Sequence, residues 1–297
     1  MYSPYPTPSP TPLSIVASPC VEYSTILDLM ASAAPTSSPD YQWQYIAKDT
    51  TSIWSAPMAV SHLYAAYSSD PNPAKTGQPF AVDPDAENFV LTITRSLDPT
   101  PNPSRPIAEL TFITPCLGES DHPNTAAPGK HSFDDGPDWL AYVLNAIGSS
   151  LIWSNTAVIV TWDDWGGFYD NYRGPSGVAW PYHPSGNPYS PPPPGHGGNT
   201  SDPNEWGFRV PLIMISPYVK SNGYISSTFV SQGAILNFIE TVFDLPTHAL
   251  KGDDATNGSN DLTDMLNLSG TPLNWTILPT HFTPLNDAQC PAPTPSP

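Results

Sequence analysis

The sequence predicts an α/β fold in which helices cover a sheet. Two nearly continuous apolar runs, Thr156–Trp162 and Val210–Ser216, have the pattern of buried strands, and helical patterns occupy 135–147 and 228–243. Strand and helix patterns that alternate along a chain are typical of α/β proteins. Ligands of open α/β sheets bind beyond the carboxyl ends of the strands. We therefore expect a site in the loops that follow residues 114 and 162.

The first elements of the chain are a helix and a strand. The apolar positions in Tyr23–Ala34 predict a helix, with Ser24 or Thr25 as its N-cap. A short helix or strand is expected near 89–94, between loops rich in Pro, Asn, Asp and Ser. Ile107–Thr114 then predicts a strand that leads into a loop containing Gly, Asp, His and Pro.

The central part of the chain carries the clearest pattern. Asp135 to Pro137 mark a helix start, and Gly148 marks its end. The β-branched run Thr156–Trp162 is typical of a strand buried on both faces in a parallel sheet. The amphipathic run Thr228–Phe243 predicts the last helix, with its apolar side, which includes Val242, turned toward the sheet.

Composition limits the class of protein. The 297 residues carry a formal net charge of −18, which argues against unaided binding to nucleic acid or to anionic membranes. No apolar stretch approaches the ~20 residues of a membrane helix, so we expect no integral membrane segment. Residues 1–18 and 284–297 are predicted to be Pro-rich tails around one α/β domain, 19–283. The first residues show no secretory signal.

Two adjacent carboxylates, Asp163 and Asp164, follow the second predicted strand. Gly166 and Gly167 come directly after them and allow a tight backbone turn near a ligand. Adjacent carboxylates repel each other, and a divalent cation with a preference for oxygen ligands would relieve that repulsion. The alternative is a pair of solvated turn residues.

The candidate histidines are His122 and His62. His122 lies in the loop after the strand 107–114, where an imidazole could ligate metal, hold a phosphoryl oxygen or protonate a leaving group. A loop histidine bonded to a backbone carbonyl is the alternative. His62 stands in an apolar context that favours a packed histidine, and Arg209, just before a strand, favours a structural ion pair.

Other catalytic signatures are absent from the sequence. It contains no P-loop, dinucleotide fingerprint, GxSxG elbow or HExxH motif. Nucleotide-dependent transfer, hydride chemistry and the common serine-hydrolase folds therefore lose support.

Three segments together resemble one known family. They are Ser120–Pro123, Trp139–Ser150 and, most specifically, the run from Trp153 to Asp170 that contains Thr-Trp-Asp-Asp-Trp-Gly-Gly. In this order they resemble the bacterial phosphoesterase family, which holds phosphatidylcholine-type phospholipases C and a group of acid phosphatases. The likeness continues through 207–218 and 233–240.

The resemblance implies an alkaline-phosphatase-like sheet and metal-assisted hydrolysis of phosphate esters, with phospholipid among the substrates to be considered. It implies that Asp163 and Asp164 bind a divalent metal ion of unknown identity and that His122 faces the phosphate. His62 aligns more weakly with another family histidine, so the resemblance makes His122 and His62 the two candidates for catalytic residues. It also implies a secreted or periplasmic location.

The chain departs from the family in one large respect. Family members begin with a strand leading to a Glu-Asn metal motif, followed by a segment with the Ser or Thr nucleophile, and neither has a counterpart in these 297 residues. At the last helix, Ser231 and Gln232 stand where the family often has Asp-His. The sequence thus predicts a C-terminal portion of the family and leaves open the competence of this chain alone.

Two further interpretations stay open. One is a truncated paralogue that folds without turnover. The other is an aromatic-rich module that binds carbohydrate or cell-wall material through Trp and Tyr residues between Trp180 and Trp206.

Overall fold

The computed structural model describes eight stretches of the chain, and the statements below concern these alone. The expected element near 89–94, both Pro-rich tails and the aromatic loop 180–206 lie outside them. The described residues are 22–33, 43–47, 56–69, 108–115, 119–122, 135–171, 208–250 and 260–282.

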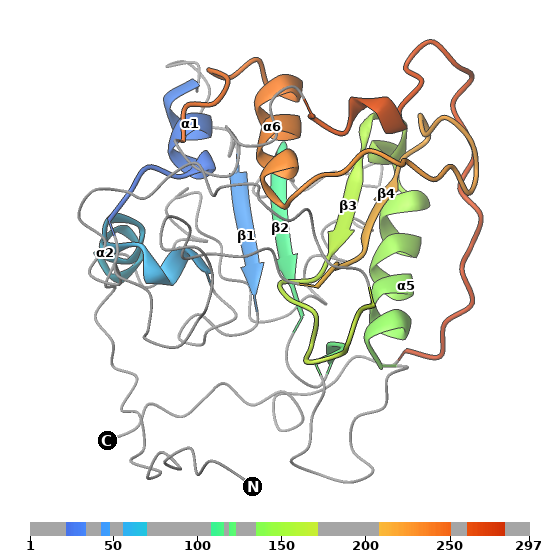
Figure 1. The fold of residues 1–297 in the computed structure, drawn as a ribbon, viewed down its shortest axis with the longest axis horizontal. Helices are drawn as coiled ribbons and strands as arrows, with labels where there is room; N and C mark the ends of the chain where they lie inside the picture. Colours follow the sequence, from blue (N-terminus) through green and yellow to red (C-terminus); the bar gives the residue numbers. More distant parts are fainter. Residues whose placement is uncertain are drawn as a thin grey trace, which may run out of the picture.

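The described strands form two pairs of opposite kind. Strands β1 (Trp43–Ala47) and β2 (Leu110–Thr114) are parallel, with Trp43 opposite Leu110. Strands β3 (Val158–Thr161) and β4 (Leu212–Ile215) are antiparallel. Figure 1 shows the first pair among helices α1, α2 and α6, and the second beside α5. The α/β class is confirmed, while the alkaline-phosphatase-like sheet stays a prediction.

The prediction that the strand over 156–162 is buried on both faces in a parallel sheet is wrong. Strand β3 exists but pairs antiparallel with β4, and its first three side chains are half-buried while that of Thr161 is exposed. A short apolar run shows that a segment is extended and partly covered, but it does not specify the direction of its partner. The parallel pair lies elsewhere, in β1 and β2.

Helix α5 (Asp135–Gly148) begins and ends where the sequence predicts. Trp139, Val143 and Ile147, spaced four residues apart, face the core and pack with Ile46 of β1. Val158 of β3 is packed against the same cluster. Helix α5 therefore joins the two strand pairs through one apolar core.

Helix α6 (Gly233–Val242) begins five residues later than predicted. The hydroxyl of Ser226 accepts a hydrogen bond from the Thr228 amide, and that of Ser231 accepts one from the Gly233 amide. Such local bonds offer the backbone an alternative to the helix. Val242, expected to face the sheet, is exposed.

The N-terminal layer is formed by helices α1 (Ile26–Ala33) and α2 (Ser61–Ser69). Thr25 and Asp28 confirm the predicted cap: the Thr25 amide and hydroxyl donate to Asp28 Oδ2, and the Asp28 amide donates to the Thr25 hydroxyl. Apolar residues of α1, β1, α2 and α6 form a common cluster. Strand β1, helix α2 and the short 3₁₀ helices η1 (Ala56–Ala59), η3 (Leu151–Asn155) and η4 (Thr263–Met265) were not predicted.

A C-terminal segment without regular secondary structure, 271–282, lies along α5 and η3. The Asn145 side chain accepts a hydrogen bond from the Leu278 amide and donates one to its carbonyl, at 2.8 and 2.9 Å. The Trp153 indole donates to the Leu273 carbonyl, and its ring meets that of Trp275 edge-on. None of the helices in the described ranges is both long and apolar enough to cross a membrane.

Candidate functional site

The two predicted acidic ligands lie at the end of β3. Asp163 and Asp164 are both exposed, and Asp164 Oδ1 accepts a hydrogen bond from the Gly166 amide. Gly166 and Gly167 have φ of 64° and 78°, a conformation that residues with a Cβ rarely adopt. The tight turn predicted after the acid pair is thus present, and it leaves three of the four carboxylate oxygens outside this bond.

The loop with His122 contacts the same end of β3. The Trp162 indole, directly before the acid pair, donates to Asp121 Oδ2 at 3.3 Å. Asp121 also lies so close to Gly136 at the start of α5 that a Cβ on this glycine would overlap its carboxylate. His122 is exposed, and its amide donates to the Ser120 hydroxyl. The structure therefore brings the two loops together, as their positions after β2 and β3 suggested.

Gln232, at the N-cap of α6, fixes the backbone of the acid pair. Its side-chain amide donates to the carbonyl oxygens of Trp162 and Asp163, at 2.9 and 3.3 Å. No contact was predicted for Gln232, because no local spacing links residues 70 positions apart. The available signal was its position, since Ser231 and Gln232 stand where the resembled family often has Asp-His.

Arg209 forms the structural ion pair that the sequence favoured. Its guanidinium donates to both oxygens of Asp170, at 2.7 and 2.9 Å. This two-point contact ties the loop after β3 to the residues before β4, and it fixes the relative position of the two chain segments.

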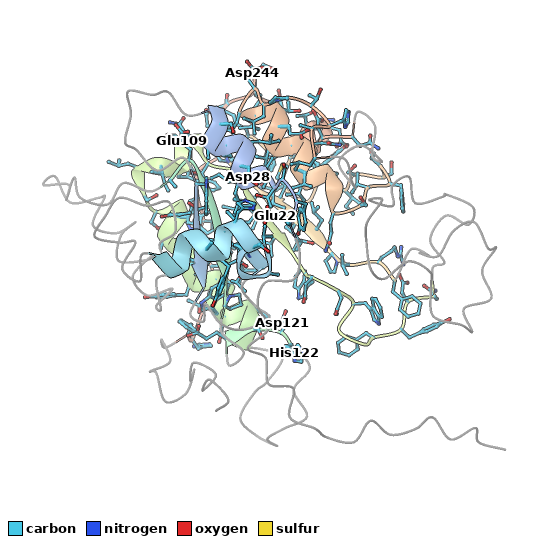
Figure 2. All side chains as sticks on the ribbon, turned by 90° about the vertical axis from the view of Figure 1, so that its left-hand side faces the viewer. Glu22, Asp28, Glu109, Asp121, His122 and Asp244 are labelled. Atoms are coloured by element: carbon cyan, nitrogen blue, oxygen red, sulfur yellow. The ribbon has the colours of Figure 1, made fainter. Side chains whose placement is uncertain are left out.

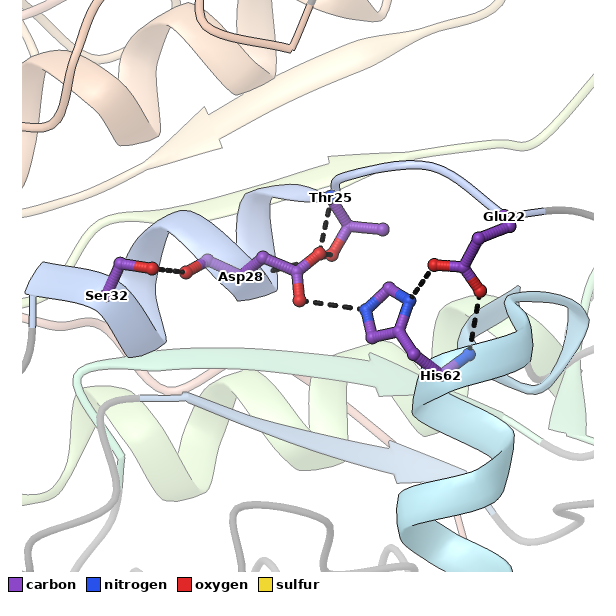
Figure 3. A network of polar contacts seen from close by, with 5 residues as sticks. All are labelled: Glu22, Thr25, Asp28, Ser32 and His62. Atoms are coloured by element: carbon purple, nitrogen blue, oxygen red, sulfur yellow. Dashed lines mark hydrogen bonds and ion pairs between the residues drawn. The ribbon is translucent and has the colours of Figure 1, made fainter.

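His62 lies in a different network, shown in Figure 3. Its Nδ1 lies 2.6 Å from Glu22 Oε1 and its Nε2 lies 2.8 Å from Asp28 Oδ1. The His62 amide also donates to Glu22 Oε2. We call Glu22, Asp28 and His62 the histidine clasp, because it joins α2 to α1 and the residues before it.

The histidine clasp shifts the pKa values of two of its members. Burial acts to lower the pKa of His62, but hydrogen bonds and charges from Asp28 and Glu22 outweigh it, so the pKa is raised. Burial acts to raise the pKa of Asp28, but bonds from Thr25 and contact with His62 outweigh it, so that pKa is lowered. Both shifts favour the charged forms of the pair.

The histidine clasp does not form one site with the loop that carries Asp121 and His122. In Figure 2, Glu22 and Asp28 lie well apart from Asp121 and His122. Both ring nitrogens of His62 already face carboxylates. The structure thus does not place His62 beside His122.

A metal centre is not completed by the described part of the chain. Within it, no three His, Cys, Asp or Glu side chains gather in a way that could hold an ion. Asp163 and Asp164 supply two carboxylates of the right chemistry, but oxygen-ligated divalent ions take six or more ligands.

The geometry defines an α/β protein in which a histidine loop and an acid pair meet at the end of a strand. Residues 105–246 match the model of the Phosphoesterase family, which confirms the resemblance seen in the sequence. Both loops of the candidate site fall within it.

Several curated relatives are phospholipases C. Non-hemolytic phospholipase C of Burkholderia pseudomallei is 28% identical over 58% of this chain and 25% of its own length. Phospholipase C B of Mycobacterium tuberculosis is 34% identical over 56% of this chain and 30% of its own length. Non-specific phospholipase C6 of Arabidopsis thaliana is 31% identical over 46% of this chain and 25% of its own length. The matches thus span about a quarter to a third of these relatives.

Proposed function

We propose that this chain serves in the hydrolysis of phosphate esters at the edge where the loops 119–122 and 162–170 meet. The observation that carries the proposal is the Trp162–Asp121 hydrogen bond, because it joins the histidine loop to the acid pair inside the family segment 105–246. The relatives, named as phospholipases C, support phosphate esters as the substrate class, with phospholipids among them.

In this proposal Asp163 and Asp164 bind a divalent cation of open identity. Their exposure and the small share of their oxygens used by the protein support this role. Such an ion would polarise a phosphoryl oxygen when bound. Gln232 would act as a positioning residue, because its amide holds the backbone of the pair from the start of α6.

His122 is proposed to contact the phosphate or to protonate the leaving group, for which its exposed imidazole beside Asp121 is suited. The catalytic role expected for His62 stays a prediction. Its position in the histidine clasp supports a different role, that of holding α2 against α1.

The competence of the chain alone is a separate question, because the matches span 25–30% of the relatives cited above. A phosphoesterase portion that needs further segments and a truncated paralogue without turnover remain the two alternatives. We also propose a secreted or periplasmic location, following the family resemblance.

Turnover and ion binding by the purified full chain test the proposal. A chromogenic phosphate monoester and a phosphocholine diester are offered with Mn²⁺, Ca²⁺, Zn²⁺ or a chelator, and Mn²⁺ binding is followed by calorimetry. Asp163→Asn with Asp164→Asn is the test variant. Asp244→Asn is the matched control, because Asp244 is exposed and lies at the opposite end of the molecule from His122 in Figure 2.

We expect Mn²⁺ binding that is lost in the double variant and kept in the control. Metal-dependent turnover with the same pattern would establish an active enzyme. Ion binding without turnover would support a metal-holding portion that needs further segments. Equal ion binding by all three proteins, or none by the folded wild type, would overturn the assignment of the acid pair.

A further inference from the structure

Four aromatic side chains gather on the surface beside the acid pair. Trp165, Phe168 and Tyr169 follow it, with 43%, 56% and 83% of their surface exposed, and Phe208, just before β4, is 36% exposed. The rings of Trp165 and Tyr169 both meet Phe208 edge-on, with centroids 5.8 and 5.4 Å away. We call these four residues the aromatic platform.

The platform is held in place by its own loop. The Phe168 amide donates to the Trp165 carbonyl at 3.0 Å, which closes the turn that Gly166 and Gly167 permit. The Arg209–Asp170 ion pair then fixes the two chain segments that supply the rings. Ordering these side chains therefore costs little when they bind a surface, because the structure has already oriented them.

Grouped exposed aromatic residues are unusual on a water-soluble surface and mark sites of interaction. Trp and Tyr are enriched where one side of a surface is apolar and the other is wet, as at the boundary of a lipid bilayer. A partner that contacts all four rings must therefore bind through apolar or aromatic surface and must not require a charged group on the platform.

Charge selects the kind of partner. Arg209 is the one cationic side chain in 162–171 and 208–211, and Asp170 neutralises it. Asp163 and Asp164 stand beside the rings, and the chain as a whole carries −18. Anionic lipids attract basic segments, so an anionic surface would repel this face. A zwitterionic bilayer offers the apolar boundary without that repulsion.

We propose that the aromatic platform docks the chain onto a zwitterionic phospholipid surface. The inference builds on the proposed function, since docking would place the loop with Asp163 and Asp164 at the level of lipid phosphate esters. Trp165 directly follows Asp164, so the platform and the acid pair approach a surface together.

Co-sedimentation of the full chain with phosphatidylcholine vesicles tests the proposal, with a chelator present so that no ester is cleaved. Phe168→Ser with Tyr169→Ser is the test variant, and Tyr169→Ser alone is a milder one. Leu151→Ser with Ile277→Ser is the matched control. Leu151 and Ile277 are 75% and 65% exposed, and they lie near the ends of β3 and α5 that are remote from the platform. Thermal unfolding shows that each variant is folded.

We expect the wild type to sediment with the vesicles and the double variant to bind at least about tenfold more weakly, because two exposed rings lose their apolar burial. The control should bind like the wild type, and phosphatidylserine added to the vesicles should weaken binding. Absence of wild-type binding, equal loss in the control, or stronger binding to anionic vesicles would overturn the proposal. So would retention on a glycan resin without vesicle binding, which would assign the platform to carbohydrate.

The two proposals fail separately. Vesicle binding is measured without turnover, whereas hydrolysis of a water-soluble monoester by the wild type needs no lipid surface. Hydrolysis without vesicle binding would leave the phosphoesterase proposal standing and remove the docking surface. Vesicle binding without ion binding or hydrolysis would leave the docking surface standing and remove the phosphoesterase proposal.

Discussion

Trp162 and Asp121, 41 positions apart in the chain, are joined by a hydrogen bond from the indole to the carboxylate. The second oxygen of the same carboxylate is buried and has no hydrogen-bond partner among the described residues. The Asp121 carboxylate therefore depends on the Trp162 indole for its hydrogen bond.

Removing the indole donor should destabilise the protein. We expect Trp162→Phe to lower the free energy of unfolding by about 1–3 kcal/mol, because the Asp121 carboxylate loses its donor while it stays partly buried. Urea denaturation followed by circular dichroism measures the change. Trp165→Phe is the control, since Trp165 is more exposed, and a loss as large in the control would contradict the role of the indole bond.

Gly136 should not tolerate a side chain. Alanine normally favours a helix over glycine by about 1 kcal/mol, yet at this position its Cβ would overlap the Asp121 carboxylate and amide. We expect Gly136→Ala to destabilise the protein by roughly 1–3 kcal/mol, as overpacked sites do. Denaturant midpoints measure this, with the exposed Ser149→Ala just after the same helix as control. A stabilised Gly136→Ala would show that the loop 119–122 does not pack on α5.

The histidine clasp should make stability depend on pH. The folded-state pKa of His62 is raised, so its contribution is present below the ordinary histidine pKa and is lost as pH rises through the folded value. The pKa of Asp28 is lowered, so its contribution is present above the ordinary aspartate pKa and is lost as pH falls through the folded value. The clasp is therefore strongest in weakly acidic solution.

We expect His62→Gln to cost more stability near pH 5.5 than near pH 8.5, by roughly 0.2–1 kcal/mol, the size of exposed ion pairs. Unfolding curves at both pH values measure this difference. In a background of Glu22→Gln with Asp28→Asn the pH dependence of the substitution should vanish. A cost independent of pH in the native background would refute the charged form of the clasp.

Gln232 should influence the acid pair from a distance. If Asp163 and Asp164 bind a divalent ion, Gln232→Met removes the amide donors that hold their backbone while it keeps the length of the side chain. We expect Mn²⁺ affinity to fall about tenfold or more, as for other outer partners of metal ligands. Calorimetry measures it. Gln44→Met, which removes an amide contact between β1 and β2, is the control and should bind as the wild type does.

The sequence predicted correctly those helices and strands whose limits are set by residues within the same segment. Both ends of helix α5 were predicted closely because Pro137, Gly148 and the spacing of its apolar residues all lie within one segment. The start of α6 was misplaced because Ser226 and Ser231 bind nearby amides, which an apolar periodicity does not reveal. The direction of β3 depends on β4, about fifty residues away.

In the candidate site, too, local features could be predicted from the sequence and long-range contacts could not. The turn after Asp163 and Asp164 could be predicted from Gly166 and Gly167, because a positive φ is a local property of glycine. The contacts of Trp162 with Asp121 and Gln232 could not, since each is set by how distant elements pack. His62 carried no charged neighbour in its own segment, so nothing in that segment revealed Glu22 and Asp28 as its partners.

The C-terminal segment also decides where the chain can be shortened. Asn145 and Trp153 satisfy their side-chain polar groups with backbone atoms of Leu278 and Leu273, and Trp275 covers Gly148 at the end of α5. A recombinant version that stopped before residue 271 would uncover an apolar face of α5. It would also leave the Asn145 side-chain amide and the Trp153 indole without these hydrogen-bond partners. A C-terminal truncation for expression therefore has to spare the residues up to Phe282, although no helix or strand marks that limit.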